Sequence, residues 1–342
     1  MNNLNPLLVE SYDYTLPKEL IASSPAQPKD SAKLLVYNRE KDTITHAIFR
    51  DIEQFIPQNT KIILNDTKVI KARLFGEKKS GGKIELLINS PLPNREFLVY
   101  IRGRVKENME LYFNHQLKAK IKKLNKDGTR VVNFFHKKSL LNFEELNQIL
   151  EQIGHIPLPP YIKREDSKDD EIDYQTLFAK NIGAVAAPTA SLHFTDELYE
   201  RVKKKFDAHF ITLHVGAGTF KPVEANSINE HIMHKEFYNI PDNTKKLLDS
   251  SQNILAVGTT VTRTIEYYKR ENIQQGESNL FLHPQNRPLR VNYLLTNFHL
   301  PKSTLIMLIA SFVGLEKTLQ LYKEAIKKEY KFYSYGDAML II

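Results

Sequence analysis

The sequence predicts a protein of mixed α/β and α+β class, with a small all-β domain inserted into its main domain. After residue 174, apolar strand patterns alternate with helical patterns, which is typical of an α/β domain. Residues 76–140 instead carry short runs in which apolar and polar residues alternate, and such runs indicate a module made of strands. The helical period returns only at residues 142–153, so the all-β segment lies inside the α/β pattern.

The first half of the chain supports this reading element by element. Strands are predicted at 33–38, 43–49 and 61–64, with a short helix before the third. Asp127-Gly128 between two alternating runs indicates a hairpin, and the run FEELNQILEQI predicts a helix with Gly154 at its C-cap. Three prolines exclude a helix at 155–161, and the dense charges of 163–173 predict a solvated loop.

The C-terminal half supplies the main strands and helices. Strands are predicted at 208–215, 254–257 and 293–296, and helices at 196–206 and 262–270. Ser303 caps a further helix, TLIMLIASFV, which is apolar all round and therefore central to the core. The simplest architecture is a barrel-like α/β domain built from both chain ends, 1–75 and 151–342. A basic, barrel-like β domain of residues 76–150 is inserted between them.

Composition narrows the classes of function. Cysteine is absent from the 342 residues, which excludes disulfide scaffolds, thiolate zinc sites, iron–sulfur clusters and cysteine nucleophiles. The 48 Lys and Arg exceed the 40 Asp and Glu. Residues 61–130 alone hold 12 Lys and 5 Arg against 7 acidic residues, so the surplus is concentrated there. This segregation favours a surface that binds the phosphates of a polyanion.

No membrane or export signal is recognised. The first 20 residues lack a basic-then-apolar pattern. The longest uncharged apolar stretch, 305–313, is far shorter than the roughly 20 residues that span a bilayer. We therefore expect a soluble, cytoplasmic protein without a membrane partner.

Two segments at predicted strand ends have the character of anion-binding loops. Gly258 permits a close approach of backbone, Thr259 and Thr260 offer hydroxyls, and the following helix presents free N–H groups. Arg263, one turn later, is able to clamp a carboxylate or phosphate; an ordinary capped helix with a surface arginine is the alternative. The second segment, with Gly216, Gly218 and Thr219, has only the GxG part of a dinucleotide fingerprint, which argues against Rossmann-type binding. There the alternative is a tight loop beside a buried His214.

Three other segments carry weaker signals. The small residues around Pro188 and Thr189, before His193, let a flat ligand lie against the backbone or let elements pack closely. His231 and His234 form an HxxH pattern on one face of a predicted helix. The pattern could hold a metal ion, but His234 paired with a carboxylate as an acid or base is the favoured interpretation. We expect no metal.

Asp66 directly follows a predicted buried strand. It is either a carboxylate aimed into a site or part of an Asx-type turn. Residues 297–303 end a later strand and cap the core helix, so the same reasoning applies to them.

Together these segments resemble one known family. The strings occur in this order: LNDTKVIKARLFG, GGKIELLI, GHIPLPPYIKR, YQTLFAKNIGAVAAPTASLHFT, LHVGAGTFKPV, MHKEFY, AVGTTVTRTIE, LLTNFHLPKSTLIMLIASFVG and FYSYGDAMLI. From about Tyr12 to the C-terminus the chain resembles the S-adenosylmethionine:tRNA ribosyltransferase-isomerases of queuosine synthesis. The departures are small: MHKEFY replaces the usual MHSEWY, AVGTTVTRT replaces the common AVGTTSVRT, and residues 283–290 differ from the usual stretch.

The resemblance implies an unusual use of S-adenosylmethionine, as a ribosyl donor and not a methyl donor. The ribosyl group moves to the aminomethyl nitrogen of 7-aminomethyl-7-deazaguanine at the tRNA wobble position and is isomerised to an epoxycyclopentane. The products are epoxyqueuosine-tRNA, adenine and methionine. The implied partner is a tRNA anticodon stem–loop, and we expect a monomer. Two readings of other classes stay open: an RNA-binding module without catalysis, and a small-molecule α/β enzyme.

This chemistry assigns expected roles to residues. His234, oriented by Glu236, is the expected base; Arg263 would hold the methionine carboxylate, and Asp66 a ribose hydroxyl or the deazaguanine. His214, His193 and His299 compete to protonate adenine. The expected S-adenosylmethionine-binding residues are Gly216, Gly218, Thr219, Gly258, Thr259, Thr260, Arg263, Pro188, Thr189 and His193. The expected RNA-binding residues are Arg73, Lys118, Lys120, Lys122 and Lys123, with the modified base extruded into the α/β site.

Overall fold

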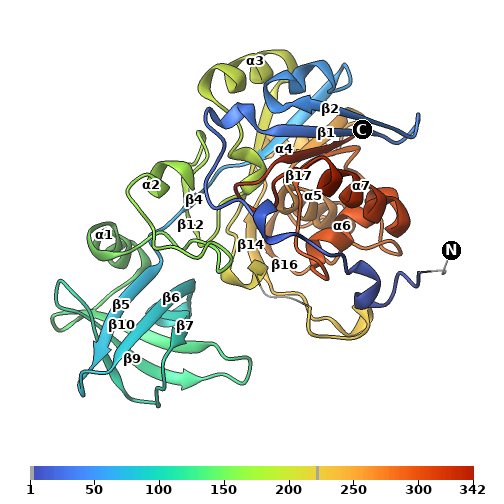
Figure 1. The fold of residues 1–342 in the computed structure, drawn as a ribbon. Helices are drawn as coiled ribbons and strands as arrows, with labels where there is room; N and C mark the ends of the chain where they lie inside the picture. Colours follow the sequence, from blue (N-terminus) through green and yellow to red (C-terminus); the bar gives the residue numbers. More distant parts are fainter. Residues whose placement is uncertain (1–3, 221–222) are drawn as a thin grey trace.

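The computed structural model describes residues 4–220 and 223–342, and it shows an α/β body from which a β barrel projects (Figure 1). Both parts of the chain that flank the barrel build the body. Strand β1 (Lys33–Asn38) pairs in parallel with β18 (Ala338–Ile341), with Leu34 opposite Ala338. The predicted mixed α/β class, with a main domain from both chain ends and an inserted β barrel, is confirmed.

A nine-stranded sheet forms the centre of the body. Its order is β16-β14-β13-β3-β15-β17-β18-β1-β2, and the central strands β13, β3, β15 and β17 are parallel to their neighbours within that group. This sheet is open, with β16 and β2 as its edge strands, whereas the strands of the inserted module close into a barrel. The remaining bounds are β2 (Thr43–Ile48), β3 (Thr60–Asn65), β13 (Ala208–Leu213), β14 (Glu236–Asn239), β15 (Asn253–Val257), β16 (Gln275–Ser278) and β17 (Tyr293–Asn297).

Helices pack around this sheet. They are α3 (Asp196–Phe206), α4 (Asp242–Leu248), α5 (Thr259–Glu271), α6 (Thr304–Val313) and α7 (Leu315–Lys327). The Ser303 hydroxyl caps α6 by accepting from the Ile306 N–H, and residues 306–311 are buried, as the apolar sequence predicts. Helix α5 begins three residues earlier than predicted, because Gly258 at φ 98° makes the turn from β15 directly into the helix.

The inserted barrel closes through six strands. The order β10-β7-β6-β5-β8-β9 is completed by pairing of β9 with β10, and β11 extends it at β10. Along this ring β9 lies three strands from β6 in either direction, so the two are on opposite sides. The bounds are β5 (Arg73–Lys78), β6 (Lys83–Leu92), β7 (Glu96–Arg102), β8 (Glu110–Tyr112), β9 (Leu117–Leu124), β10 (Arg130–His136) and β11 (Ser139–Leu140).

Helix α1 (Phe143–Ile153) closes one end of the barrel core. A capping box between Asn142 and Glu145 starts it, and Leu146 and Leu150 join the hydrophobic cluster inside the barrel. Gly154 ends it as predicted, but for a different reason. Its φ is −83°, and a Cβ there would lie 2.2 Å from the Lys71 carbonyl oxygen, so a close approach requires the glycine.

Strands β4 (Thr67–Val69) and β12 (Asn181–Ala184) form a parallel pair between barrel and body. No single helix among the residues described is long and apolar enough to cross a membrane. Helices α6 and α7 together have the length and apolar composition of such a segment, but the chain bends by 111° between them.

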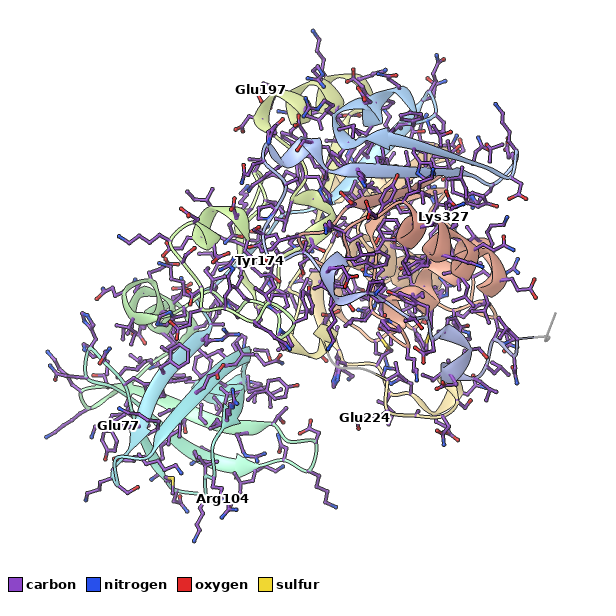
Figure 2. The ribbon with its side chains drawn as sticks, in the orientation of Figure 1. Glu77, Arg104, Tyr174, Glu197, Glu224 and Lys327 are labelled. Carbon is purple, nitrogen blue, oxygen red and sulfur yellow. The ribbon has the colours of Figure 1, made fainter. Side chains whose placement is uncertain are left out.

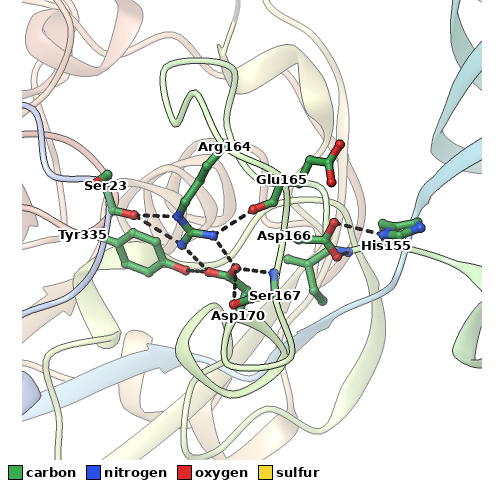
Figure 3. Close-up of polar contacts among 9 residues, drawn as sticks. Ser23, His155, Arg164, Glu165, Asp166, Ser167, Asp170 and Tyr335 are labelled. Carbon is green, nitrogen blue, oxygen red and sulfur yellow. Dashed lines mark hydrogen bonds and ion pairs between the residues drawn. The ribbon is translucent and has the colours of Figure 1, made fainter.

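The charged segment 163–173 differs from its prediction as a solvated loop. Within it α2 (Asp170–Asp173) begins at a carboxylate that is 2% exposed. Figure 3 shows the reason: both Asp170 oxygens accept from the Arg164 guanidinium, at 2.6 and 2.7 Å, and further bonds come from Ser167 and the Tyr335 hydroxyl. A carboxylate that is paired and hydrogen-bonded can be buried even where its cationic partner, here Arg164, stays exposed. Sequence charge density alone does not reveal that pairing.

The Asp170 network predicts an acid-dependent contribution to stability. Burial alone would raise the pKa of Asp170, but Arg164, Ser167 and Tyr335 outweigh it and lower the pKa to about 2. The contribution is therefore complete above about pH 4 and is lost as the pH falls toward 2. Asp170→Asn should cost about 2 kcal/mol or more of unfolding free energy at pH 7, measured with urea. The exposed neighbour variant Asp169→Asn is the control, and equal losses in both would contradict a special role for Asp170.

Candidate functional site

The carboxyl ends of four parallel strands meet at one edge of the main sheet. There β3 ends at Asn65, β13 at Leu213, β15 at Val257 and β17 at Asn297. Strand β14 runs antiparallel to β13, so its first residue, Glu236, lies at the same edge. Ligands of open α/β sheets bind outside this edge. The segments singled out in the sequence are therefore gathered in one region.

A cavity of about 700 Å³, part of it open to solvent, lies at this edge. Half of the residues expected to bind S-adenosylmethionine line this first cavity: Pro188, Thr189, Gly258, Thr259 and Thr260. The first cavity therefore brings together the segment after β12 and the turn between β15 and α5.

The lining suits a flat ligand with hydroxyl groups. Ala186, Ala187 and Pro188 offer small side chains along one stretch of backbone, while Leu300 and Tyr333 add apolar surface. Hydroxyls come from residues on several elements: Tyr161, Thr189, Thr259, Thr260, Thr296, Ser303 and Ser334. Helices α5 and α6 begin beside the cavity, and helix N-termini favour anionic or electron-rich groups.

His299 and His193 are both near this cavity but occupy different positions. His299 lines it and has its Nε2 2.8 Å from the Thr296 hydroxyl. His193 is buried beside it, with its ring against Phe49 and its Nε2 3.1 Å from the side-chain nitrogen of Asn297. Burial lowers the pKa of His299 to about 3 and that of His193 to about 4. Both imidazoles are therefore neutral near pH 7, and a neutral imidazole donates through only one nitrogen.

Glu236 and Arg263 form a buried ion pair next to the first cavity. The Arg263 Nη1 lies 2.7 Å from the Glu236 carboxylate, and the two side chains are 7% and 5% exposed, Arg263 first. The other Glu236 oxygen accepts from the Gly216 N–H at 3.1 Å, and the Arg263 Nε donates to the Leu280 carbonyl. Among the residues described, Arg263 Nη2 has no hydrogen-bond partner although it is buried. A buried cationic donor with a spare N–H is suited to an anionic group of a ligand.

His234 lies over the GxG loop. A Cβ on Gly218 would come within 2.6 Å of the His234 ring, so the glycine makes room for the imidazole. The prediction of an HxxH helix face is wrong, because residues 231–235 are irregular and lead into β14, whose pairing with β13 overrides any helical pattern. Burial lowers the pKa of His231, and the charge of the nearby His234 lowers it further. Within residues 4–220 and 223–342 no group of three His, Asp or Glu is placed to hold a metal.

Asp66 and His214 tie strands together at the same edge. The Asp66 carboxylate accepts from the Thr212 hydroxyl at 2.6 Å, and its carbonyl accepts from the N–H groups of Lys180 and Asn181. His214 has its Nδ1 2.8 Å from the Thr67 hydroxyl. Burial lowers the pKa of His214, and the negative charge of Asp66 opposes that effect. The Thr219 side chain lies outside the described part of the structure.

Several site residues were not found from the sequence. Tyr161, Tyr333 and Ser334 line the first cavity from segments with no local signal beyond the family strings that contain them. Asn89, on β6 of the barrel, accepts from the Ala217 N–H at 2.9 Å and so joins the barrel to the GxG loop. Only the tertiary structure brings an asparagine of the inserted module to this loop.

A second cavity of about 710 Å³ separates the barrel from the body. Arg73 and Tyr100 line it from the barrel, and Pro157, Val185 and Ala217 line it from the body. The first cavity is lined by the adjoining Ala186 and Val215, so one stretch of hydrogen-bonded backbone divides the two.

The expected RNA-binding residues divide between two faces of the barrel. Lys118, Lys120 and Lys122 alternate with buried residues on β9, and Lys123 follows them at a bulge. Arg73 lies instead at the second cavity, where its Nε is 3.2 Å from Glu85. The lysines and Arg73 therefore do not form one continuous surface.

A pocket at the carboxyl edge of a parallel sheet, joined to an inserted basic barrel, defines an α/β enzyme that carries an additional binding module. The family model described as "Queuosine biosynthesis protein" matches residues 9–341. The chain belongs to this family. The S-adenosylmethionine:tRNA ribosyltransferase-isomerase of a Nitratiruptor species is 62% identical over 99% of this chain and 100% of that protein. The protein of the same name from Sulfurimonas denitrificans is 64% identical over 98% of each chain.

A solved structure agrees with the sequence relatives. The crystal structure of S-adenosylmethionine tRNA ribosyltransferase from Thermotoga maritima is 33% identical and matches with a TM-score of 0.53. The match covers 97% of this chain and 100% of that one. The resemblance stated from the sequence strings is therefore confirmed for the family over nearly the full length.

The two buried histidines predict a pH-dependent stability. Each has a folded-state pKa below its usual value of 6.5, so its stabilising contribution is complete above pH 6.5 and is lost as the pH falls. The loss approaches about 1.4 kcal/mol per pH unit for each group. In His299→Gln, which keeps a partner for Thr296, unfolding free energy from urea curves should fall less steeply between pH 6.5 and 4.5. His115→Gln, in an exposed position, is the control, and an unchanged slope in His299→Gln would contradict the account.

Proposed function

We propose that this chain transfers the ribosyl group of S-adenosylmethionine to the aminomethyl group of 7-aminomethyl-7-deazaguanine in tRNA and isomerises it, releasing adenine and methionine. The observation that carries this proposal is the first cavity, where Pro188, Thr189, Gly258, Thr259 and Thr260 converge at the ligand-binding edge of the sheet. Its mixture of small, apolar and hydroxyl side chains is suited to a nucleoside.

The reaction needs a base, an acid and an anchor for the methionine. A base removes the acidic proton on the carbon beside the sulfonium, and His234 over Gly218 is the proposed group. Arg263 is the proposed anchor of the methionine carboxylate, through Nη2, while Glu236 positions its guanidinium. His299, in the cavity wall, is the proposed hydrogen-bond donor to departing adenine; because its pKa is about 3, it acts as a neutral imidazole and not as a protonated acid. His214 is the alternative.

The inserted barrel is the proposed RNA-binding module. The lysines of β9 present their charges outward, where they can hold phosphates. We also propose that the division into domains follows the predicted bounds, 1–75 with 151–342 and 76–150. We also propose that the protein acts as a monomer in the cytoplasm, where tRNA is found.

The direct test is product analysis. Purified protein is incubated with S-adenosylmethionine and an anticodon stem–loop that carries 7-aminomethyl-7-deazaguanine, and the small products are separated by chromatography. Free adenine and methionine should appear in equal amounts, only with the modified RNA. A stem–loop with unmodified guanine is the control, because it lacks the accepting amine. Methylated RNA with S-adenosylhomocysteine, or no adenine at all, would falsify the proposal.

The same materials separate the two alternative classes. An RNA-binding module without catalysis should give no heat with S-adenosylmethionine in titration calorimetry. A small-molecule enzyme with an incidental basic surface should release adenine without RNA.

His234 is tested by its conservative variant. His234→Gln cannot take up a proton, so turnover should fall about 100-fold or more while calorimetric affinity for S-adenosylmethionine is retained. Gly218→Ala should lower turnover too, because its Cβ would displace the His234 ring. His231→Gln is the matched control and should keep near wild-type turnover. Normal turnover in His234→Gln would remove the assignment.

A further inference from the structure

His299 is fixed at the wall of the first cavity by three hydroxyl groups from separate parts of the chain. Its backbone N–H donates to the Tyr322 hydroxyl at 3.0 Å, and its carbonyl accepts from the Tyr14 hydroxyl. Tyr322 belongs to α7, the helix whose last residue, Lys327, is labelled in Figure 2. The third hydroxyl, that of Thr296 on β17, lies 2.8 Å from the His299 Nε2. Both the backbone and one edge of the ring are therefore held in place.

The Thr296 hydroxyl decides which ring nitrogen of His299 carries the proton. Thr296 is 1% exposed, and within residues 4–220 and 223–342 its hydroxyl has no hydrogen-bond partner other than the His299 Nε2. A buried hydroxyl whose proton finds no acceptor is destabilising. The Thr296 hydroxyl therefore donates to Nε2. In a neutral imidazole that accepts at Nε2, the proton is on Nδ1.

The other ring nitrogen of His299 is open to the first cavity. Nδ1 has no hydrogen-bond partner in the described part of the chain. Buried ring nitrogens without a partner occur there in His209 and His283, but not in His299. Because the His299 side chain lines the first cavity, its Nδ1 is left to face a ligand. Burial lowers the pKa of His299 to about 3, so the ring stays neutral and keeps a single N–H.

The surroundings of His299 suit a purine ring. Tyr333 and Leu300 line the first cavity with it, and the Tyr333 N–H donates to the carbonyl of Phe298, the residue before His299. Among the described residues that line this cavity, none is a carboxylate, a lysine or an arginine. A neutral N–H donor beside an aromatic ring and an aliphatic side chain favours an uncharged heterocycle that accepts hydrogen bonds. Adenine is such a heterocycle, because its ring nitrogens are acceptors.

We propose that Thr296 is a positioning residue that holds His299 in the Nδ1–H tautomer, so that Nδ1 donates to a ring nitrogen of adenine as adenine leaves. The inference rests on the proposed function and adds the nitrogen that donates and the residue that sets it. When the bond between ribose and adenine breaks, its electron pair stays on adenine, and the hydrogen bond stabilises that charge. The reaction frees one proton from the carbon beside the sulfonium and one from the amine, and adenine takes up one of these.

The tautomer can be measured by NMR without any substrate. In protein with isotope-labelled histidine, the protonated and the bare ring nitrogens of a neutral imidazole give well-separated signals. The His299 signals are those that disappear in His299→Gln. Wild type should carry its proton on Nδ1. Thr296→Val keeps the shape of the side chain without the hydroxyl, so both tautomers should appear, and Thr296→Ser should restore the wild-type signals.

Two results of this measurement would overturn the proposal. One is a wild-type His299 that carries its proton on Nε2. The other is an unchanged tautomer in Thr296→Val, because the hydroxyl would then select nothing.

Two amide variants report which nitrogen donates to adenine. In His299→Asn the amide nitrogen can take the place of Nδ1, whereas in His299→Gln it takes the place of Nε2, beside Thr296. With the modified stem–loop, adenine release by His299→Asn should stay within about tenfold of wild type, and release by His299→Gln should fall about 100-fold or more. Calorimetric affinities for S-adenosylmethionine should differ less than the rates, because the hydrogen bond strengthens as adenine leaves. An equal or higher rate in His299→Gln would contradict donation from Nδ1.

The rates of threonine variants separate positioning from packing. Turnover should fall about tenfold in Thr296→Val and recover in Thr296→Ser, with little change in KM. Thr244→Val is the matched control, because it removes another fully buried hydroxyl, on α4, that lines neither cavity. It should keep the turnover and the His299 signals of wild type. Equal losses in the two valine variants would leave Thr296 a packing role only and overturn the proposal.

Failure of the proposed function would be distinguishable from failure of this inference. A wild-type protein that releases no adenine would contradict the proposed function. The NMR measurement needs no turnover, so it would still decide whether Thr296 sets the tautomer of His299.

Discussion

One backbone carbonyl fixes the wall between the two cavities, and the lining of both cavities depends on it. The N–H groups of Val185 and Ala186 both donate to the carbonyl of Val215, at 2.8 and 3.2 Å. These bonds hold the segment after β12 against the segment after β13. Because their neighbours are alanine and glycine, little more than backbone lies between the two spaces. The wall therefore keeps the two spaces apart, so a reaction between two ligands must take place within one of them.

The GxG loop beside this wall is fixed from both sides by buried polar groups. Asn89 of the barrel accepts from Ala217, while Glu236 of the body accepts from Gly216 and pairs with Arg263. A buried ion pair gains little stability on balance, because desolvation offsets the attraction, but removing either partner is costly. Glu236 and Arg263 therefore serve chiefly to hold the loop and to present one guanidinium N–H. The barrel is thereby connected to this edge of the sheet by a hydrogen bond as well as by chain continuity.

The sequence alone was sufficient for the class of fold, and five of the residues that it predicted to bind S-adenosylmethionine line one cavity, while their role stays a prediction. Alternating apolar and polar runs predicted the barrel. The glycine and threonines at 258–260 predicted the turn from strand β15 into helix α5, because this turn needs only local residues. Three features escaped prediction because they depend on distant partners. The Asp170 carboxylate is paired with Arg164, residues 231–235 form an irregular segment before β14, and Glu236 is held by Arg263 on another element. No pattern of neighbouring residues encodes those contacts, although the full family strings contain most of the residues that make them.

The measurement that tests this account most directly is a crystal structure of the protein with S-adenosylmethionine bound. The account predicts the adenine against Ala186 and Pro188 in the first cavity, the methionine carboxylate on Arg263, and the ribose facing the backbone of Val215. A nucleoside bound away from that edge, or a methionine carboxylate that does not contact Arg263, would contradict it.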